Sequence, residues 1–195
     1  PGLVIATPSS PADAAAMLRT CVALAREEGA VCAFLEPIAL YHTRDLHDGD
    51  DAWAEEYPSP DTWVAPGSAR TYGVGEDVTI VTFGNGVRLS RRAARRLEER
   101  GIGCRVVDLR WHAPLPLGDI LREASATGRL LVVDETRATG GVGEGIVTAA
   151  VLGGFSGRVA RVAARDSYIP LGPAAETVLV SEDAIVEAAV ALTRG

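Results

Sequence analysis

The chain has 195 residues and a formal net charge of −7, with 47% hydrophobic and 23% charged residues. This composition is typical of a folded α/β protein and excludes a disordered chain. The acidic balance disfavours nucleic acid as a partner, because that binding depends on neutralising phosphates with basic side chains. All 19 basic residues are arginines, so lysine nucleophiles and Schiff bases are excluded. No apolar run is long enough to cross a membrane, and a cytoplasmic location is expected.

The first 42 residues are expected to form one strand, helix, strand unit. Residues 3–7 are a short apolar run typical of a buried strand. The segment 9–29 begins with Ser and Pro and ends at Gly29, as a helix does. Its apolar face is expected to carry Ala14, Met17, Leu18, Cys21 and Leu24. Residues 30–36 form a second buried strand, and such a unit cannot close a core alone.

Residues 43–75 are acidic and rich in turn residues, which indicates an ordered linker. Because the linker carries two tryptophans, we expect it to pack across a surface. A second domain is expected over 76–195, in which strands alternate with helices. The expected strands are 77–84, 102–110, 129–135 and 158–166, and the expected helices are 87–101, 116–128, 143–154 and 181–195. This order predicts a three-layer α/β/α fold around a mostly parallel sheet covered on both faces.

Cysteine and histidine give no metal or disulfide pattern. The three cysteines lack paired spacing and lie in apolar stretches, which favours buried reduced thiols: Cys21, Cys32 and Cys104. The three histidines are too scattered for a metal site: His42, His47 and His112. No metal-binding residue is therefore assigned.

The glycine-rich segment 135–145 follows an expected strand and precedes an expected helix. Its spacing does not fit a dinucleotide fingerprint or a nucleotide-phosphate loop, so we interpret it as tight turns packed against another chain. Glu36, Asp134 and Glu135 stand at the carboxyl ends of strands, where ligand crevices form in α/β sheets. Capping or ion pairing is nevertheless the favoured role for these carboxylates.

The helix at 87–101 carries a run of arginines with Glu98 and Glu99 on its exposed side: Arg91, Arg92, Arg95 and Arg96. The favoured interpretation is a solvated face with ion pairs. A docking patch for an acidic protein partner is the alternative. No signature of a nucleophilic hydrolase is present.

Four strings together resemble the C-terminal domain of the transketolase superfamily: DVTIVTFGNGV, GCRVVDLRWHAPLP, TGRLLVVDETRATGGVGEGI and SEDAIVEAAVAL. Upstream, PGLVIATPSSPADAAAMLRTCV and AFLEPIALY are similar to the end of the pyrimidine-binding domain in the beta subunit of 2-oxo acid dehydrogenases, and APGSAR to its connector. The resemblance implies a five-stranded, mostly parallel sheet with one antiparallel edge strand. Residues 1–42 would then be a partial pyrimidine-binding domain, 43–75 a linker and 76–195 the C-terminal domain.

The resemblance implies the C-terminal portion of an enzyme that decarboxylates pyruvate or a branched-chain 2-oxo acid and passes the acyl group to a lipoyl domain. Thiamine diphosphate and magnesium serve the complete enzyme, and neither is expected on this chain, which lacks the family's catalytic and cofactor-binding residues. The segment ALAREEGAV lacks the Asp and Asn of the family's potassium loop, so that site is not carried over. Because the chain starts without Met in mid-domain, we expect a fragment that is inactive alone.

Assembly is the role that the resemblance assigns to this chain. The interface candidates are Arg110, Glu135, Gly141 and Gly143. Expected partners are an alpha subunit or the N-terminal half of a fused chain, a second copy in a homodimer, and a dihydrolipoyl acyltransferase core. Two alternatives remain open: a stand-alone binding or scaffolding module with the same fold, and a fragment of a transferase similar to deoxyxylulose phosphate synthase.

Overall fold

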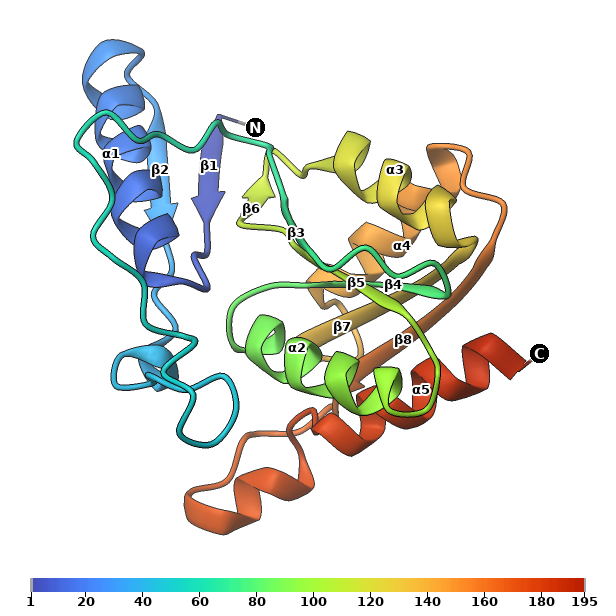
Figure 1. The fold of residues 1–195 in the computed structure, drawn as a ribbon. Helices are drawn as coiled ribbons and strands as arrows, with labels where there is room; N and C mark the ends of the chain where they lie inside the picture. The colour runs from blue at the N-terminus through green and yellow to red at the C-terminus, as the bar shows by residue number, and fades with distance from the viewer. Residues whose placement is uncertain (1, 195) are drawn as a thin grey trace.

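The structure is a computed structural model that describes residues 2–194, and it contains two sheets placed side by side (Figure 1). The elements follow in chain order: β1 (Leu3–Ala6), α1 (Pro11–Glu27), β2 (Val31–Phe34), η1 (Ile38–Leu40), β3 (Arg70–Tyr72), β4 (Val78–Thr82), α2 (Asn85–Glu98), β5 (Cys104–Asp108), β6 (Trp111–Ala113), α3 (Leu117–Thr127), β7 (Arg129–Arg137), α4 (Val142–Leu152), β8 (Arg158–Ala164), η2 (Gly172–Thr177) and α5 (Glu182–Arg194). None of the described helices is long and apolar enough to cross a membrane.

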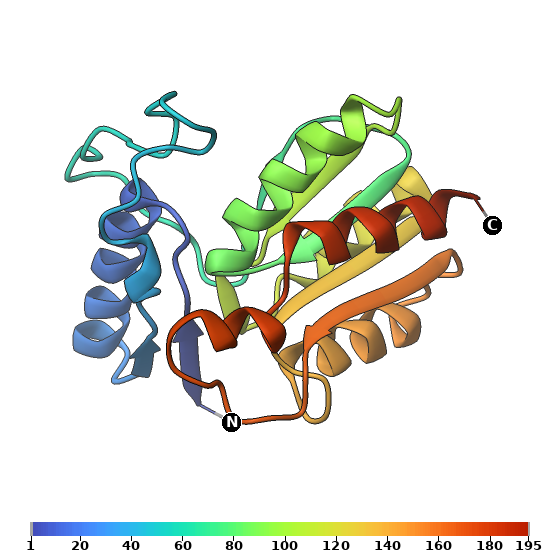
Figure 2. The same cartoon turned by 90° about the horizontal axis from the view of Figure 1, so that it is seen from below.

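The larger sheet has five strands in the order β3-β5-β4-β7-β8. All neighbours are parallel except β3, which pairs antiparallel with β5 at the edge. Helices cover both faces, with α2 and α5 on one side and α3 and α4 on the other (Figure 2). The three-layer fold, the mostly parallel sheet and its antiparallel edge strand are therefore confirmed.

The apolar side chains of the central strands point alternately to the two faces of this sheet and build a core on each face. In β7, Leu131 and Val133 face α2 and α5, whereas Leu130 and Val132 face α3 and α4. Successive side chains of a strand point to opposite faces, so a continuous apolar run serves both layers. All four side chains are fully buried.

The N-terminal unit forms a smaller sheet of order β2-β1-β6. β1 and β2 are parallel, as expected of a strand, helix, strand unit, and α1 packs on them through Met17 and Cys21. Ser10 caps α1 by accepting from the Asp13 backbone N–H at 3.3 Å. Leu18, expected on the buried face, is 47% exposed, because the helix buries Ala16, Met17 and Cys21 instead.

Two short strands correct the expected boundaries. β3 lies inside the segment 43–75 that the sequence indicates as linker, and it completes the five-stranded sheet. The strand expected over 102–110 ends at Asp108 as β5, and the chain continues as β6 in the other sheet. Of the two tryptophans that led to the expectation of surface packing, Trp53 is 3% exposed and lies against Val87 of α2, whereas Trp63 is 55% exposed.

Candidate functional site

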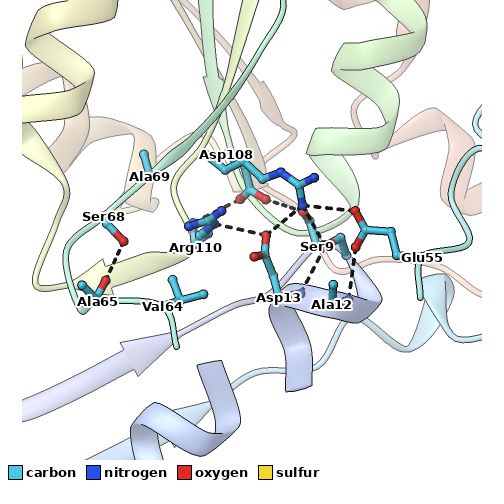
Figure 3. A network of polar contacts seen from close by, with 12 residues as sticks. Ser9, Ala12, Asp13, Glu55, Val64, Ala65, Ser68, Ala69, Asp108 and Arg110 are labelled. Atoms are coloured by element: carbon cyan, nitrogen blue, oxygen red, sulfur yellow. Dashed lines mark hydrogen bonds and ion pairs between the residues drawn. The ribbon is translucent and has the colours of Figure 1, made fainter. Parts of the chain in front are cut away.

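The two sheets meet where β6 leaves the larger domain and pairs antiparallel with β1. The Thr7 backbone N–H donates to the Arg110 carbonyl at 2.7 Å across this seam. A set of polar side chains, here called the junction network, gathers at the start of α1, in the segment before β3, on β3 and at the end of β5: Ser9, Ser10, Asp13, Glu55, Arg70, Asp108 and Arg110. Figure 3 shows Ser9, Asp13, Glu55, Asp108 and Arg110 pointing toward one another. The network connects four segments of the chain.

Two arginines converge on the carboxylate of Asp13 in α1. Arg110 Nε lies 3.1 Å from Asp13 Oδ2, and Arg70 Nη1 lies 3.4 Å from the same oxygen. Arg70 also reaches Glu55 Oε1 at 3.1 Å. The side chains of Asp13 and Arg110 are only 8% and 14% exposed. Because a buried charge is costly unless it is paired, this network requires all of its members.

The backbone at Arg110 explains how its side chain reaches α1. Arg110 has a φ of 59°, in the left-handed region that residues other than glycine rarely adopt. Its backbone N–H donates to Asp108 Oδ1 at 3.1 Å, which holds the turn after β5. The turn sends Trp111 into the other sheet, where it is fully buried. The DLR string thus forms the turn by which the chain passes from the larger sheet to the smaller one.

Asp108 lies at the centre of the junction, with no exposed surface. Its carboxylate accepts a hydrogen bond from the Ser9 hydroxyl, in addition to the one from the Arg110 backbone. Burial raises the pKa of Asp108 to about 7, since the charged form loses its hydration and Asp13 carries a second negative charge nearby. The protonation of the junction is therefore sensitive to pH near neutrality.

A small pocket of about 150 Å³ lies at the carboxyl ends of strands from both sheets, and Thr7, Phe83 and Glu135 are among its lining residues. Next to it, His112 Nε2 lies 2.9 Å from the Thr7 hydroxyl, and its ring packs edge-on against Phe83 at 4.5 Å. Burial lowers the pKa of His112, which favours a neutral imidazole. On the other side of the pocket, Glu36 accepts a hydrogen bond from Tyr41 at 2.5 Å.

Glu135 bridges β7 to the start of α2. Its carboxylate accepts hydrogen bonds from the Gly86 backbone N–H and from Asn85 Nδ2, the latter at 2.9 Å. Burial raises the pKa of Glu135, and the helix N-terminus is a favourable place for its charge. The carboxylate thus caps α2 from a neighbouring strand.

The glycine-rich segment packs against Asp134, the residue before Glu135. Asp134 Oδ2 accepts from the Gly143 N–H at 2.5 Å, and a Cβ on Gly143 would lie 2.9 Å from that same oxygen. A Cβ on Gly141 would lie 2.5 Å from the Arg137 carbonyl. Only glycine fits at these two positions, so they shape the entry to α4.

The chemistry available to these groups is ion pairing and capping. The carboxylates at the strand ends accept hydrogen bonds from backbone amides, the Asn85 side-chain amide or hydroxyl groups of this chain, so none is arranged as a free general base. Within residues 2–194, no group of three or more His, Cys, Asp or Glu is placed to hold a metal ion. The three cysteines are free; Cys21 is buried, whereas Cys32 and Cys104, expected to be buried, are only partly so.

The structure places the four predicted interface candidates in two groups. Arg110 belongs to the junction network, whereas Glu135, Gly141 and Gly143 surround the ends of β7 and the start of α4. Each makes contacts within its own chain, and a contact with another chain stays a prediction. Ser9 and Asp13 are not predictable as site residues from the sequence, because a Ser and an Asp at a helix start look like ordinary capping residues.

Three comparisons relate the chain to known proteins. The family described as "Transketolase, C-terminal domain" matches residues 67–185. Pyruvate dehydrogenase E1 component subunit beta from Staphylococcus aureus is 32% identical over 193 residues, which is 97% of this chain and 55% of that protein. The protein of the same name from Bacillus subtilis is also 32% identical, over the same shares. The chain therefore spans about 55% of the length of the curated relatives it matches.

A solved structure titled "Split gene transketolase, inactive beta4 tetramer" has a TM-score of 0.76 to this chain. It is 24% identical, and the match covers 100% of this chain and 59% of that one. At this identity the likeness concerns the fold, and it includes the N-terminal unit as well as the larger domain.

Proposed function

The chain belongs to the transketolase C-terminal domain family, and we propose that it is the C-terminal portion of a thiamine-diphosphate-dependent 2-oxo acid dehydrogenase. In this proposal it is part of a separate beta subunit or of the rear half of a fused chain. The observation that carries the proposal is the alignment with pyruvate dehydrogenase E1 beta subunits over 97% of the chain. A match over 97% of the chain extends beyond residues 67–185, the segment that the family matches, and its 32% identity exceeds the 24% of the transketolase structure, which supports a beta subunit.

The complete enzyme would use thiamine diphosphate and magnesium, bound by parts other than this chain. The loop best suited to a diphosphate is the glycine-rich segment, whose amides are already engaged. Gly143 N–H binds Asp134, and Gly140 N–H binds Glu144 Oε2 at 3.0 Å. Residues 2–194 thus do not fit the cofactor or its metal ion, and no catalytic step is assigned to them.

The role proposed for this chain is assembly. The junction network would hold the pyrimidine-binding part and the C-terminal domain in one fixed arrangement, which a cofactor bound between protein parts requires. Arg110, Glu135, Gly141 and Gly143 are proposed to lie near the contact with a second copy. An alpha subunit, or the front half of a fused chain, and a dihydrolipoyl acyltransferase core are the other proposed partners.

The activity is tested on the full reading frame that contains this chain, produced together with its alpha partner. We expect decarboxylation of pyruvate or a branched-chain 2-oxo acid, measured by reduction of an artificial electron acceptor, only when thiamine diphosphate is added. Transfer of a two-carbon unit between sugar phosphates, with no 2-oxo acid consumed, would contradict the dehydrogenase assignment and favour a transketolase.

The assembly role is tested with a matched pair of variants, Arg110→Ala and Asp13→Ala. Both remove the same ion pair within the chain. If Arg110 also contacts a second copy, Arg110→Ala weakens the dimer in sedimentation experiments more than Asp13→Ala does. Equal effects of the two variants would show that Arg110 acts only inside its own chain.

A further inference from the structure

A second, larger pocket lies away from the strand ends, between α2 and the edge formed by β3 and β5. Its volume is about 620 Å³. The wall is largely apolar, with Leu46, Val74, Ala94 and Val106 among its residues. Its polar lining consists of side chains of mixed charge and hydroxyl character: His47, Tyr72, Arg91, Arg95 and Glu98.

Arg91 differs from the other arginines of α2. The helical spacing predicts it on the solvated face, but its guanidinium lies against the rings of Tyr72 and Trp53, at 4.3 and 5.4 Å from their centroids. Arg92 pairs with Glu182 at 2.5 Å, and Arg96 and Arg95 also have carboxylate partners. Among residues 2–194, Arg91 has neither an ion-pair partner within 4.0 Å nor a hydrogen-bond acceptor.

The aromatic rings around Arg91 also carry unused donors. Tyr72 Oη and Trp53 Nε1 are buried, and neither has a hydrogen-bond partner within the described part of the chain. Buried polar groups in native proteins are nearly always bonded, so such a group calls for an explanation. Here three unpaired donors from α2, β3 and the segment before β3 lie next to one another.

Stacking on aromatic rings satisfies the faces of a guanidinium but leaves its N–H edges free. Burial lowers the pKa of Arg91, yet an arginine keeps its charge in proteins. The other charged carboxylate and guanidinium groups lining the pocket are Arg95 and Glu98. Asp50 and Glu55 act on Arg91 only from beyond ion-pair distance, so within residues 2–194 its guanidinium has no direct carboxylate partner. A planar oxyanion matches the free edge of a guanidinium through two parallel hydrogen bonds.

We propose that this pocket binds a small organic acid, whose carboxylate pairs with Arg91 and whose apolar body packs against Leu46, Val74 and Val106. The apolar walls favour an organic acid over an inorganic anion, because they contribute by excluding water from an apolar body. Tyr72 lines the same wall, and the face of its ring supports the Arg91 guanidinium. This site is independent of the proposed function and involves none of the interface candidates.

The probe is benzoate, titrated into the ¹⁵N-labelled chain, with the side-chain Nε–H signal of Arg91 observed by NMR. Benzyl alcohol, which has a similar body without the charge, and inorganic phosphate, which has charge without the body, are the comparison probes. We expect saturable shifts with benzoate and much weaker binding of the two others. Equal binding of benzyl alcohol, equal binding of phosphate, or no saturable shift with benzoate would overturn the proposal.

Arg91→Gln removes the charge and is expected to weaken benzoate binding roughly 10- to 100-fold, as for the loss of a charge-assisted hydrogen bond. Arg100→Gln, at an exposed position just after α2, is the matched control and should leave binding unchanged. Unchanged affinity in Arg91→Gln would contradict the site. If Arg91→Gln does not fold, the comparison of the three probes on the unmodified chain decides the question.

Discussion

Replacing Asp108 with asparagine is expected to change how the stability of the chain depends on pH. Asp108 is completely buried, and burial raises the pKa of its carboxyl to about 7, from an ordinary value of 3.8. Between these two pH values the folded chain keeps a proton at Asp108 that the unfolded chain has released. A folded state that holds an extra proton loses stability as the pH rises. The contribution of Asp108 to the free energy of unfolding therefore falls as the pH rises to about 7 and stays constant above that pH.

The size of this effect follows from the pKa difference. Each pH unit between the two pKa values changes the free energy of unfolding by about 1.4 kcal/mol. From about pH 5 to about pH 8, the unmodified chain should lose roughly 3 kcal/mol through this one group. The Asp108→Asn variant has no titrating group there, and its amide can accept from the Arg110 N–H while donating to Ser9. The variant should therefore gain stability relative to the unmodified chain as the pH rises.

The measurement is urea unfolding of both chains across this pH range, followed by tryptophan fluorescence, to which the buried Trp53 and Trp111 contribute. Taking the difference between the two chains cancels titrations that they share, such as those of Asp119 and Asp166, whose lowered pKa values act with the opposite sign. A difference that does not change with pH would refute the reasoning. It would mean that attraction to Arg110 and the hydrogen bonds outweigh the cost of burial and keep Asp108 charged.

Three further outcomes are expected from other parts of the structure. Arg110→Ala should lower the free energy of unfolding by about 2 kcal/mol, because Asp13 keeps only its longer contact to Arg70; a shift in the urea midpoint measures this. Gly143→Ala should cost about 1–3 kcal/mol, measured by thermal unfolding, since its Cβ would crowd the buried Asp134. Cys21 should resist iodoacetamide at mildly alkaline pH until the chain unfolds, because it is buried and burial raises its pKa to about 11; labelling followed by mass spectrometry checks this.

The sequence was sufficient for the elements that have strong local signals. The central strands β4 and β7 are continuous apolar runs, and α2 and α5 have clear apolar faces, so their type and order follow from periodicity. The resemblance to a known family supplied the antiparallel edge strand, which spacing alone does not predict. Short elements were harder to predict. β3 has three residues and no alternating pattern, so the sequence pattern indicated a linker at its position.

The junction network lay beyond the reach of local patterns. A non-glycine residue with a left-handed backbone, such as Arg110, looks the same in sequence as one in a continuing strand. The pairing of Asp13 with Arg110 joins positions 97 residues apart, and nothing in the spacing connects them. Arg91 was placed on the solvated face because helical spacing shows which residues share a side, but not which segment covers that side.

The seam between β1 and β6 has a consequence for how the chain folds. β1 pairs with residues more than 100 positions later, and Ser9 finds Asp108 at a separation of 99. Contacts between distant positions form slowly, because the entropy cost of closing the intervening loop comes before the pairing lowers the free energy. β1 and β2 are close enough in sequence to pair early, but β6 can join them only after β5 and the turn at Arg110 have formed, so the β1 edge stays unpaired until then. A piece cut near residue 76 would leave Asp108 and Trp111 without their partners, so the two sheets are expected to fold and unfold in a single cooperative step.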